Sequence, residues 1–497
     1  MPLLTGKHPN ASRAFYPSFD GGLNLSVPNE SLAQNELKEA LNVEFSNLTG
    51  SLRVRGGLVW TGRFSGEIGE AVPVFGGGGF LARIKNSNNA VYFTSNCTWD
   101  IDGTFSSDTE RLSAAAWGEH GEHVIACGGK LQLFDPVGSQ GRPEITTIAN
   151  SPDNCRLVFV KDGRVGVISG DDTISFSAIG DCESWENDPD DLSSGQFIDI
   201  GYKDGMNITA AIPLSRDLII FKSPPGDPTK GTIWRLIGNS PSEWQAAEAA
   251  HNTGTFSQNS VQAIANDVYY LTPYGLANLS SVTAYGEVKT SWPDRKVASE
   301  LARKVRVTCQ LWNVPLKQQL WVLTQTNEPI IWIYDYGRGI WTQFEFPVIP
   351  AYVSGSDRKL YVFIGRDLYQ LEDAYTQDEL YLQTPSEIKA KLRFGTILRG
   401  MQTLIKAAFI SFVSEKAHGG DLDINGFIMP FTADVLPPYY IYANGDKIYG
   451  NTRPILTGNG VLTARRRCLV RGWAVTPRIE AYGGFALSTM GFEIAEV

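Results

Sequence analysis

The 497-residue chain has few of the side chains that most often bind metals or form covalent cross-links. It contains five histidines and six cysteines, and no two cysteines have the C-x-x-C spacing of zinc and redox sites. In a chain of this length we expect free, half-buried thiols and not a disulfide framework. No run of 18 apolar residues occurs, so a membrane-spanning helix is not expected. The first residues lack the apolar core of a secretory signal, and we expect a protein made in a cytosol.

Complete catalytic motifs are also missing. The sequence has no G-x-S-x-G nucleophile turn, no P-loop and no dinucleotide-binding glycine pattern in a βαβ context. Gly76–Gly79 is a four-glycine turn and not a phosphate-binding loop, because no Lys-Ser/Thr pair and no helix follow it. The S-x-D-x-G-x-T-W repeat of sialidase propellers is absent as well. We therefore predict that the protein is not an enzyme, with no catalytic residue and no cofactor.

Two segments have part of a metal-binding pattern. His120 and His123 lie three residues apart, whereas a helical zinc motif places its two histidines four apart, so we interpret them as a turn. Asp421–Gly426 matches the first half of a calcium loop, but Thr432 stands where a bidentate glutamate is needed. A tight Asn-Gly turn explains that segment better, and no metal site is predicted.

The charge of the chain is negative and unevenly distributed. The net charge is −10, which argues against a general nucleic-acid binder, because such proteins are usually basic. Residues 1–250 hold 19 Lys and Arg against 31 Asp and Glu, and residues 251–497 hold 24 against 22. The acidic excess therefore lies in the first half of the chain.

One short stretch concentrates this acidic charge in a polar, proline-containing segment. Its carboxylates are Asp181, Glu183, Glu186, Asp188, Asp190 and Asp191. A carboxylate pair of a glycosidase is one interpretation, but that chemistry needs one raised and one ionised carboxyl in a cleft. A solvated loop at the rim of a blade is the other interpretation. If that rim faces a DNA channel, the loop would be part of a repulsive lining.

The densest basic run lies near the C-terminus, at Arg465, Arg466, Arg467 and Arg471. On a strand, alternation would send Arg465 and Arg467 to one face and Arg466 to the other. The run is either an edge strand protected by charge or a surface that docks on an acidic partner or on DNA phosphates. The sequence leaves both interpretations open.

The pattern of apolar residues predicts an all-β protein. Glycine and proline together number 76 and aromatic residues 55, which favours strands separated by turns. Between residues 61 and 385, strand pairs begin near 80, 123, 157, 218, 268, 320 and 360. Their mean spacing of about 47 residues matches the period of propeller blades, so we predict a β-propeller of about six blades.

The segments outside this region differ from it. Residues 1–60 form an N-terminal segment, and residues 386–497 read as a β-rich domain, so we predict that the two together build a platform. We also predict short helices at Glu36–Leu41 and Glu243–His251. A third helix, Asp294–Val305, is predicted within a possible insertion near residues 286–310.

Several short motifs together resemble the tail nozzle proteins of short-tailed phages, also called packaged-DNA stabilisation proteins. The central motifs are Thr173–Ser177, Asp181, Trp185, Ile198–Gly201, Asp204-Gly205, Ile208, Leu218–Lys222, Ile233–Gly238, Val268–Leu271 and Gly275-Leu276. The opening and closing motifs are Gly21–Asn24, Asn42-Val43, Gly50–Arg53 with Arg55, Arg467-Cys468, Arg471-Gly472 and Gly491–Ile494. Together these motifs extend over most of the chain.

The resemblance implies a virion protein of the tail, made in the bacterial host's cytoplasm. It implies a six-bladed propeller with a platform, assembled as a hexameric ring below the portal and its adaptor. The expected partners are other copies of the chain, the tail adaptor and portal-associated proteins, and tail fibres or spikes. Genomic DNA would pass through the ring without sequence-specific binding, and the ring would retain the packaged genome until ejection. The alternatives are a propeller interaction or receptor-binding tail component, and a carbohydrate-active propeller enzyme.

Overall fold

The structure is a computed structural model of the whole chain. It describes residues 11–16, 18–45, 51–74, 79–94, 98–214, 216–282, 287–324, 329–348, 350, 352–356, 359–373, 375, 377–413, 439–443, 446–449, 455–456, 461–476, 478–482 and 486–496. In the described ranges from residue 397 onward, the structure describes the backbone throughout, but side chains only for Thr476 and Arg478.

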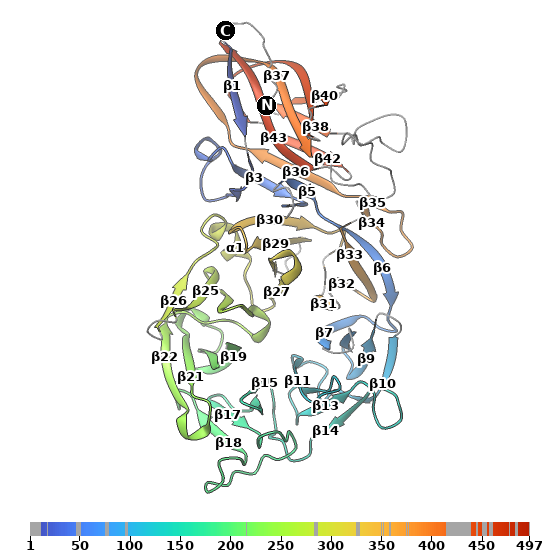
Figure 1. The fold of residues 1–497 in the computed structure, drawn as a ribbon, viewed down its shortest axis with the longest axis vertical. Coiled ribbons are helices and arrows are strands. Elements are labelled where there is room, and N and C mark those ends of the chain that lie inside the picture. The colour runs from blue at the N-terminus through green and yellow to red at the C-terminus, as the bar shows by residue number, and fades with distance from the viewer. Residues whose placement is uncertain are drawn as a thin grey trace.

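Four-stranded antiparallel sheets, arranged as the blades of a propeller, make up most of the described chain (Figure 1). Blade 1 is β7 (Ile68–Val74), β8 (Gly79–Ile84), β9 (Asn89–Phe93) and β10 (Thr98–Thr104), and blade 2 is β11 (Ser113–Ala116), β12 (His123–Ala126), β13 (Gln132–Asp135) and β14 (Glu144–Thr147). Blade 3 is β15 (Leu157–Lys161), β16 (Arg164–Ile168), β17 (Thr173–Phe176) and β18 (Gln196–Asp199), and blade 4 is β19 (Asn207–Leu214), β20 (Asp217–Ser223), β21 (Thr232–Ile237) and β22 (Gln245–His251).

The remaining three blades complete the ring. Blade 5 is β23 (Val261–Ile264), β24 (Asp267–Thr272), β25 (Gly275–Val282) and β26 (Glu287–Ser291), and blade 6 is β27 (Gln310–Val314), β28 (Gln319–Leu323), β29 (Ile330–Asp335) and β30 (Ile340–Glu345). Blade 7 is β31 (Tyr352–Ser356), β32 (Lys359–Ile364), β33 (Asp367–Glu372) and the N-terminal strand β6 (Gly57–Arg63). The innermost strand of each blade contacts that of the next, and β31 contacts β7, so the circle is closed.

The fold class is confirmed, with a blade count one above the expected number. The seven predicted strand pairs fall one in each of the seven blades that the described residues form. Strand β6, far from β33 in sequence, supplies the outer strand of blade 7, so that this blade also has four strands.

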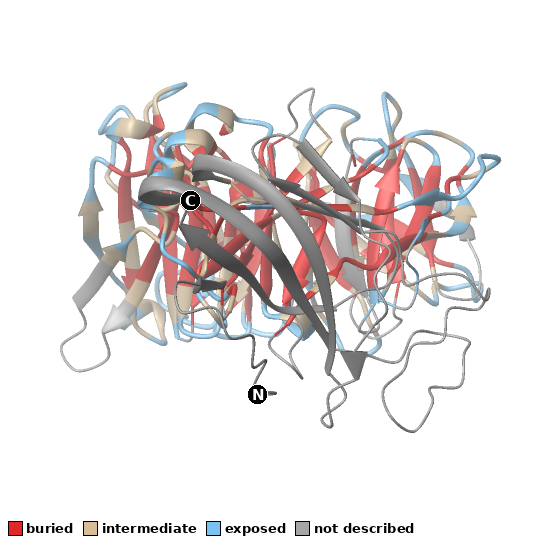
Figure 2. Cartoon of the chain, turned by 90° about the horizontal axis from the view of Figure 1, so that it is seen from above, coloured by how far each residue is buried: buried red, intermediate tan, exposed pale blue. Residues whose placement is uncertain are grey.

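The core lies between neighbouring blades, as strand β20 illustrates. Leu218 and Ile220 pack in the cluster shared with blade 3, and Ile219 and Phe221 pack in the cluster shared with blade 5. Successive side chains of a strand point to opposite faces, so both faces of this blade are buried. Figure 2 shows the buried strands between exposed loops on either side of the ring.

The platform adjoins the outer strand of blade 6. Here β30 continues through β3 (Glu36–Leu41) into β36 (Lys389–Phe394), β42 (Arg478–Tyr482), β38 (Tyr439–Ala443) and β39 (Asp446–Tyr449), and β2 (Gly22–Leu23) pairs with β3. A second sheet has the order β4 (Val43–Phe45), β5 (Leu52–Val54), β43 (Ala486–Glu496), β37 (Ile397–Val413), β41 (Val461–Val475) and β40 (Ile455–Leu456), with β1 (Ala11–Tyr16) beside β43. Both ends of the chain therefore contribute to the platform, and this part of the predicted fold is confirmed. A short pair, β34 (Gln377–Asp378) and β35 (Ser386–Glu387), follows blade 7.

Of the three predicted helices, one is found. The prediction for Glu36–Leu41 is wrong, because this segment is β3, paired with β36. The prediction for Glu243–His251 is wrong too, because only the 3₁₀ turn η3 (Pro241–Glu243) precedes β22, and the pairing of β22 with β21 overrides the helix preference of its alanines. The segment of the third predicted helix, Asp294–Val305, contains α1 (Ala298–Lys304).

The other helical segments of the described residues are short 3₁₀ turns. They are η1 (Asn29–Ser31), η2 (Pro228–Lys230), η4 (Gln258–Ser260) and η5 (Pro315–Lys317). No helix in the described ranges has the length and apolarity that crossing a membrane requires.

Candidate functional site

The acidic stretch predicted from the sequence is a loop between β17 and β18, the two outer strands of blade 3. The loop therefore lies on the circumference of the propeller and not beside its innermost strands. Asp181, Glu183, Glu186, Asp188, Asp190 and Asp191 are all exposed. Exposed apolar side chains lie among these carboxylates and on the neighbouring edge strand: Ile179 (56% exposed), Leu192 (50%) and Phe197 (59%).

A buried arginine ties this loop to the blade. Arg164, at the start of β16, is 1% exposed. Its guanidinium donates hydrogen bonds to the carbonyl oxygens of Ser177 and Ser194, both at 2.6 Å, and to that of Leu192. Burial lowers the pKa of Arg164, while the nearby charges of Asp191 and Asp162 oppose that shift. The backbone of the loop is thus tied to the blade although its carboxylates point to solvent.

Three of the carboxylates also fix the local turns of the loop. Oδ1 of Asp181 accepts the amide of Glu183 at 2.8 Å, and Oδ1 of Asp188 accepts the amide of Asp190 at 3.0 Å. Asp191 accepts hydrogen bonds from the hydroxyl and the amide of Ser193, which lower the pKa of this aspartate. Asp and Asn side chains stabilise turns in this way.

The arginine run lies on β41, which pairs with β37 in the platform. Arg465, Arg466 and Arg467 stand opposite Phe409, Ala408 and Ala407, and Arg471 stands opposite Leu404. On the other side of β41, strand β40 pairs only with Leu462 and Thr463. Within the described residues, the second edge of β41 is therefore unpaired along the arginine run. The facing of the arginine side chains stays a prediction, since they lie outside the described part of the chain.

Polar side chains bridge the axis of the propeller. Asn259, just before the innermost strand of blade 5, donates from Nδ2 to Oε1 of Glu70 in blade 1 at 3.0 Å. Oε2 of Glu70 accepts the amide of Leu112 at 2.8 Å. Arg111, before blade 2, donates from Nη2 to the carbonyl oxygen of Val307, before blade 6, at 3.2 Å. Because each pair joins blades three positions apart around the ring, these bonds cross the axis at the face where the innermost strands begin.

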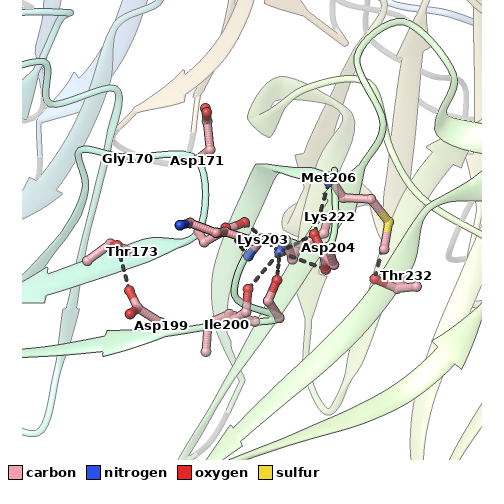
Figure 3. A network of polar contacts seen from close by, with 12 residues as sticks. Gly170, Asp171, Thr173, Asp199, Ile200, Lys203, Asp204, Met206, Lys222 and Thr232 are labelled. Carbon is pink, nitrogen blue, oxygen red and sulfur yellow. Dashed lines mark hydrogen bonds and ion pairs between the residues drawn. The ribbon is translucent and has the colours of Figure 1, made fainter.

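A buried ammonium joins blades 3 and 4 (Figure 3). Nζ of Lys222, at the end of β20, has no exposed surface and lies 2.7 Å from Asp172 and 2.8 Å from Asp204. It also donates to the carbonyl oxygens of Ile200 at 2.6 Å and Gly201 at 3.1 Å. Two carboxylates and two carbonyls saturate the three donors of an ammonium. This lysine is therefore a structural clamp between the blades.

A second set of buried ion pairs connects the platform to the propeller. Nη1 and Nη2 of Arg55 contact the carboxylate of Asp378, at 2.9 and 2.6 Å, in a bidentate pair. Glu44 of β4, which is 2% exposed, lies 2.8 Å from Arg53 and 3.0 Å from Lys317 of blade 6. These pairs are buried where the two parts of the chain meet.

The segments with partial metal-binding patterns have ordinary surroundings where the structure describes them. His123 is buried beside its own turn, with Nδ1 2.9 Å from the carbonyl oxygen of Gly121, and burial lowers its pKa. His120 is exposed. Among the described side chains, no three His, Cys, Asp or Glu residues are grouped as a metal ion would require. Asp421–Gly426 and Thr432 lie outside the described residues.

The side chains of four of the six cysteines are described, and all four are buried free thiols: Cys127, Cys155, Cys182 and Cys309. Burial raises the pKa of each thiol, to about 12 for Cys155. A thiol with a raised pKa is a poor nucleophile at neutral pH.

The comparisons with known proteins identify no family for the chain. No family profile matches the chain, and no curated protein sequence matches it. Among solved structures, the WD40 β-propeller domain of Doa1 is similar at 12% identity, covering 63% of this chain and 96% of that chain with a TM-score of 0.40. BamB from Moraxella catarrhalis is similar at 10% identity, covering 63% and 98% with a TM-score of 0.38.

A third similar structure is the extracellular domain of BT4673, a putative hybrid two-component system from B. thetaiotaomicron. It is 10% identical and covers 89% of this chain and 63% of that chain, with a TM-score of 0.45. At these identities and TM-scores, none of the three structures indicates a role for this chain. The protein is a β-propeller, as its sheet order defines.

The polar contacts at the axis and between the blades were missed by sequence reasoning. Lys222 belongs to one of the short motifs of the family resemblance, but its apolar neighbours indicate only a strand. Asn259 and Glu70 are 189 residues apart, and no local spacing connects them.

Proposed function

We propose that the protein is a structural virion protein, a tail nozzle subunit that assembles into a ring and lets packaged DNA pass between subunits. The sequence motifs that resemble tail nozzle proteins are the first support. The bridged propeller axis is the structural observation that restricts where the DNA would pass: a duplex on that axis would have to break the Glu70–Asn259 and Arg111–Val307 bonds. A conduit built from this subunit therefore lies between propellers.

The charge of the chain suits a conduit that releases its contents. Phosphate contacts from lysine and arginine add to affinity, and many of them would hold the genome in place. Six copies of a chain with net charge −10 carry about −60, which repels a polyanion. The exposed carboxylates of blade 3 supply part of this charge.

The platform supplies a second surface for assembly. It projects from blade 6 and carries the arginine run on the edge of β41 that is unpaired within the described residues. In a tail, the expected neighbours of such a surface are other copies of the chain, the adaptor and portal-associated proteins, and tail fibres or spikes. The ion pairs of Arg55 and Glu44 would keep the platform fixed against the propeller under load.

Sedimentation velocity over a range of protein concentrations tests ring assembly. We expect a discrete species with six times the 54.5 kDa chain mass. Particles assembled without the protein should lose their packaged DNA. A chain that stays monomeric, together with particles that retain DNA without it, would contradict the proposal and favour a propeller interaction module.

A further inference from the structure

The outer edge of blade 3 has exposed apolar side chains and, in the part of the chain that the structure describes, no neighbouring strand. There β18 pairs with β17 alone, whereas the outer strand β30 of blade 6 is covered by β3. Phe197 on β18 and Ile179 and Leu192 on the adjoining loop are each at least half exposed. Large apolar side chains that gather at one place on a surface are typical of an interaction site.

This edge is also preorganised and strongly negative. The hydrogen bonds from Arg164 fix the loop backbone, so the positions from which the apolar and acidic side chains project are set before any partner binds. Glu183, Glu186 and Asp190 are exposed, and their carboxylates make no hydrogen bond or ion pair in the described structure. A partner of this surface should therefore combine positive charge with an apolar strand.

The chain itself carries a segment with these properties. Arg465, Arg466 and Arg467 lie on β41 between apolar residues, along an edge that is unpaired within the described residues. In Figure 1 the platform, with β37 and β43, lies at one end of the molecule, and β17 and β18 of blade 3 lie at the other. One copy cannot close this contact on itself, so the two surfaces can meet only between copies.

We propose that the acidic, apolar edge of blade 3 binds the arginine-bearing edge of β41 in a second copy of the chain. Two different surfaces then meet in a head-to-tail contact, and such a contact generates a ring when the rotation between copies closes. This inference rests on the proposed ring-forming function and identifies the surfaces that form the ring. It also assigns the arginine run to protein contact and not to DNA.

Charge reversal on the two surfaces tests the contact. The acid variant is Glu183→Lys with Glu186→Lys and Asp190→Lys, which leaves the three turn-forming aspartates of the loop in place. The arginine variant changes Arg465, Arg466 and Arg467 to Glu. Each variant alone should weaken association, measured by sedimentation velocity, by about tenfold or more, because like charges would face each other. Combining both sets in one chain should restore association, because the charges are again complementary.

A matched control separates this contact from a general effect of net charge. Asp108→Lys with Glu243→Lys and Glu387→Lys changes the charge by the same amount at exposed acids elsewhere, and should associate like the wild type. Phe197→Ser with Leu192→Ser should weaken association without reducing its salt dependence. If the wild type forms rings and both reversed variants assemble as the control does, the inference fails while the proposed function stands. If the wild type forms no ring, both fail.

Discussion

Replacing Lys222 with methionine would remove the charge that joins blades 3 and 4 while nearly preserving the volume of the side chain. The carboxylates of Asp172 and Asp204, which are 15% and 22% exposed, would then lose the cation that neutralises them. Removing one partner of a buried ion pair typically costs about 3–5 kcal/mol, because the remaining charge is left uncompensated. We expect Lys222→Met to lower the free energy of unfolding by about this amount, measured by urea denaturation.

The pH dependence of the same variant provides an independent check. Burial alone would raise the pKa of Asp172, but the hydrogen bonds from Lys222 and from the amide of Lys203 outweigh it, so this pKa is lowered. A lowered pKa contributes stability at pH values above the unfolded value of about 3.9, and this stability is lost as the pH falls through the folded value. The loss of stability in acid should therefore be smaller in Lys222→Met than in the wild type.

A compensated variant controls for the packing change. Lys222→Met with Asp172→Asn and Asp204→Asn removes all three charges, and should recover much of the lost stability. If Lys222→Met alone costs less than about 1 kcal/mol, or if the triple variant is no more stable than the single one, the clamp does not act as an ion network and the reasoning is refuted.

Three further changes test other parts of the structure. Burial raises the pKa of Asp294 to about 6, so this carboxyl stabilises the fold at low pH and loses that contribution as the pH rises through 6. In urea titrations, the stability of Asp294→Asn relative to the wild type should therefore rise by up to about 3 kcal/mol between pH 4 and pH 7. A difference that stays constant with pH would contradict this. Asp378→Leu leaves the buried Arg55 without its carboxylate and should cost about 3–5 kcal/mol by the same assay, whereas a cost below about 1 kcal/mol would refute the role of this pair. Chelation with EDTA should leave the melting temperature unchanged, and a fall of several degrees would reveal a structural metal.

The blades could be predicted from the sequence because each contains a local hairpin. The turn between β15 and β16 is an example: Asp162 and Gly163 both have positive φ, at 53° and 71°, which is the conformation that tight hairpins require and that Asp-Gly favours. The strands on either side pair without a break, from Leu157 opposite Ile168 to Lys161 opposite Arg164. Turn chemistry and apolar pattern thus agree within a dozen residues.

The errors arose where long-range pairing outweighs local preference. Glu36–Leu41 has acidic residues early and apolar residues at helical spacing, yet it forms β3 because β36, some 350 residues later in the chain, supplies its hydrogen-bond partners. The candidate surfaces could be located by charge alone. Contacts between distant parts of the chain could not be predicted from any local pattern. Examples are the bonds from Arg164 to the backbone of the acidic loop and the bond between Asn259 and Glu70 across the axis.

Electron cryo-microscopy of the assembled protein bound in a DNA-filled tail would locate the DNA relative to the propellers. We expect a ring of subunits whose DNA density runs through an opening between propellers, with side-chain density bridging each propeller's own axis at Glu70 and Asn259. DNA density along the axis of a single propeller, or propellers attached singly to the outside of the tail, would contradict this expectation.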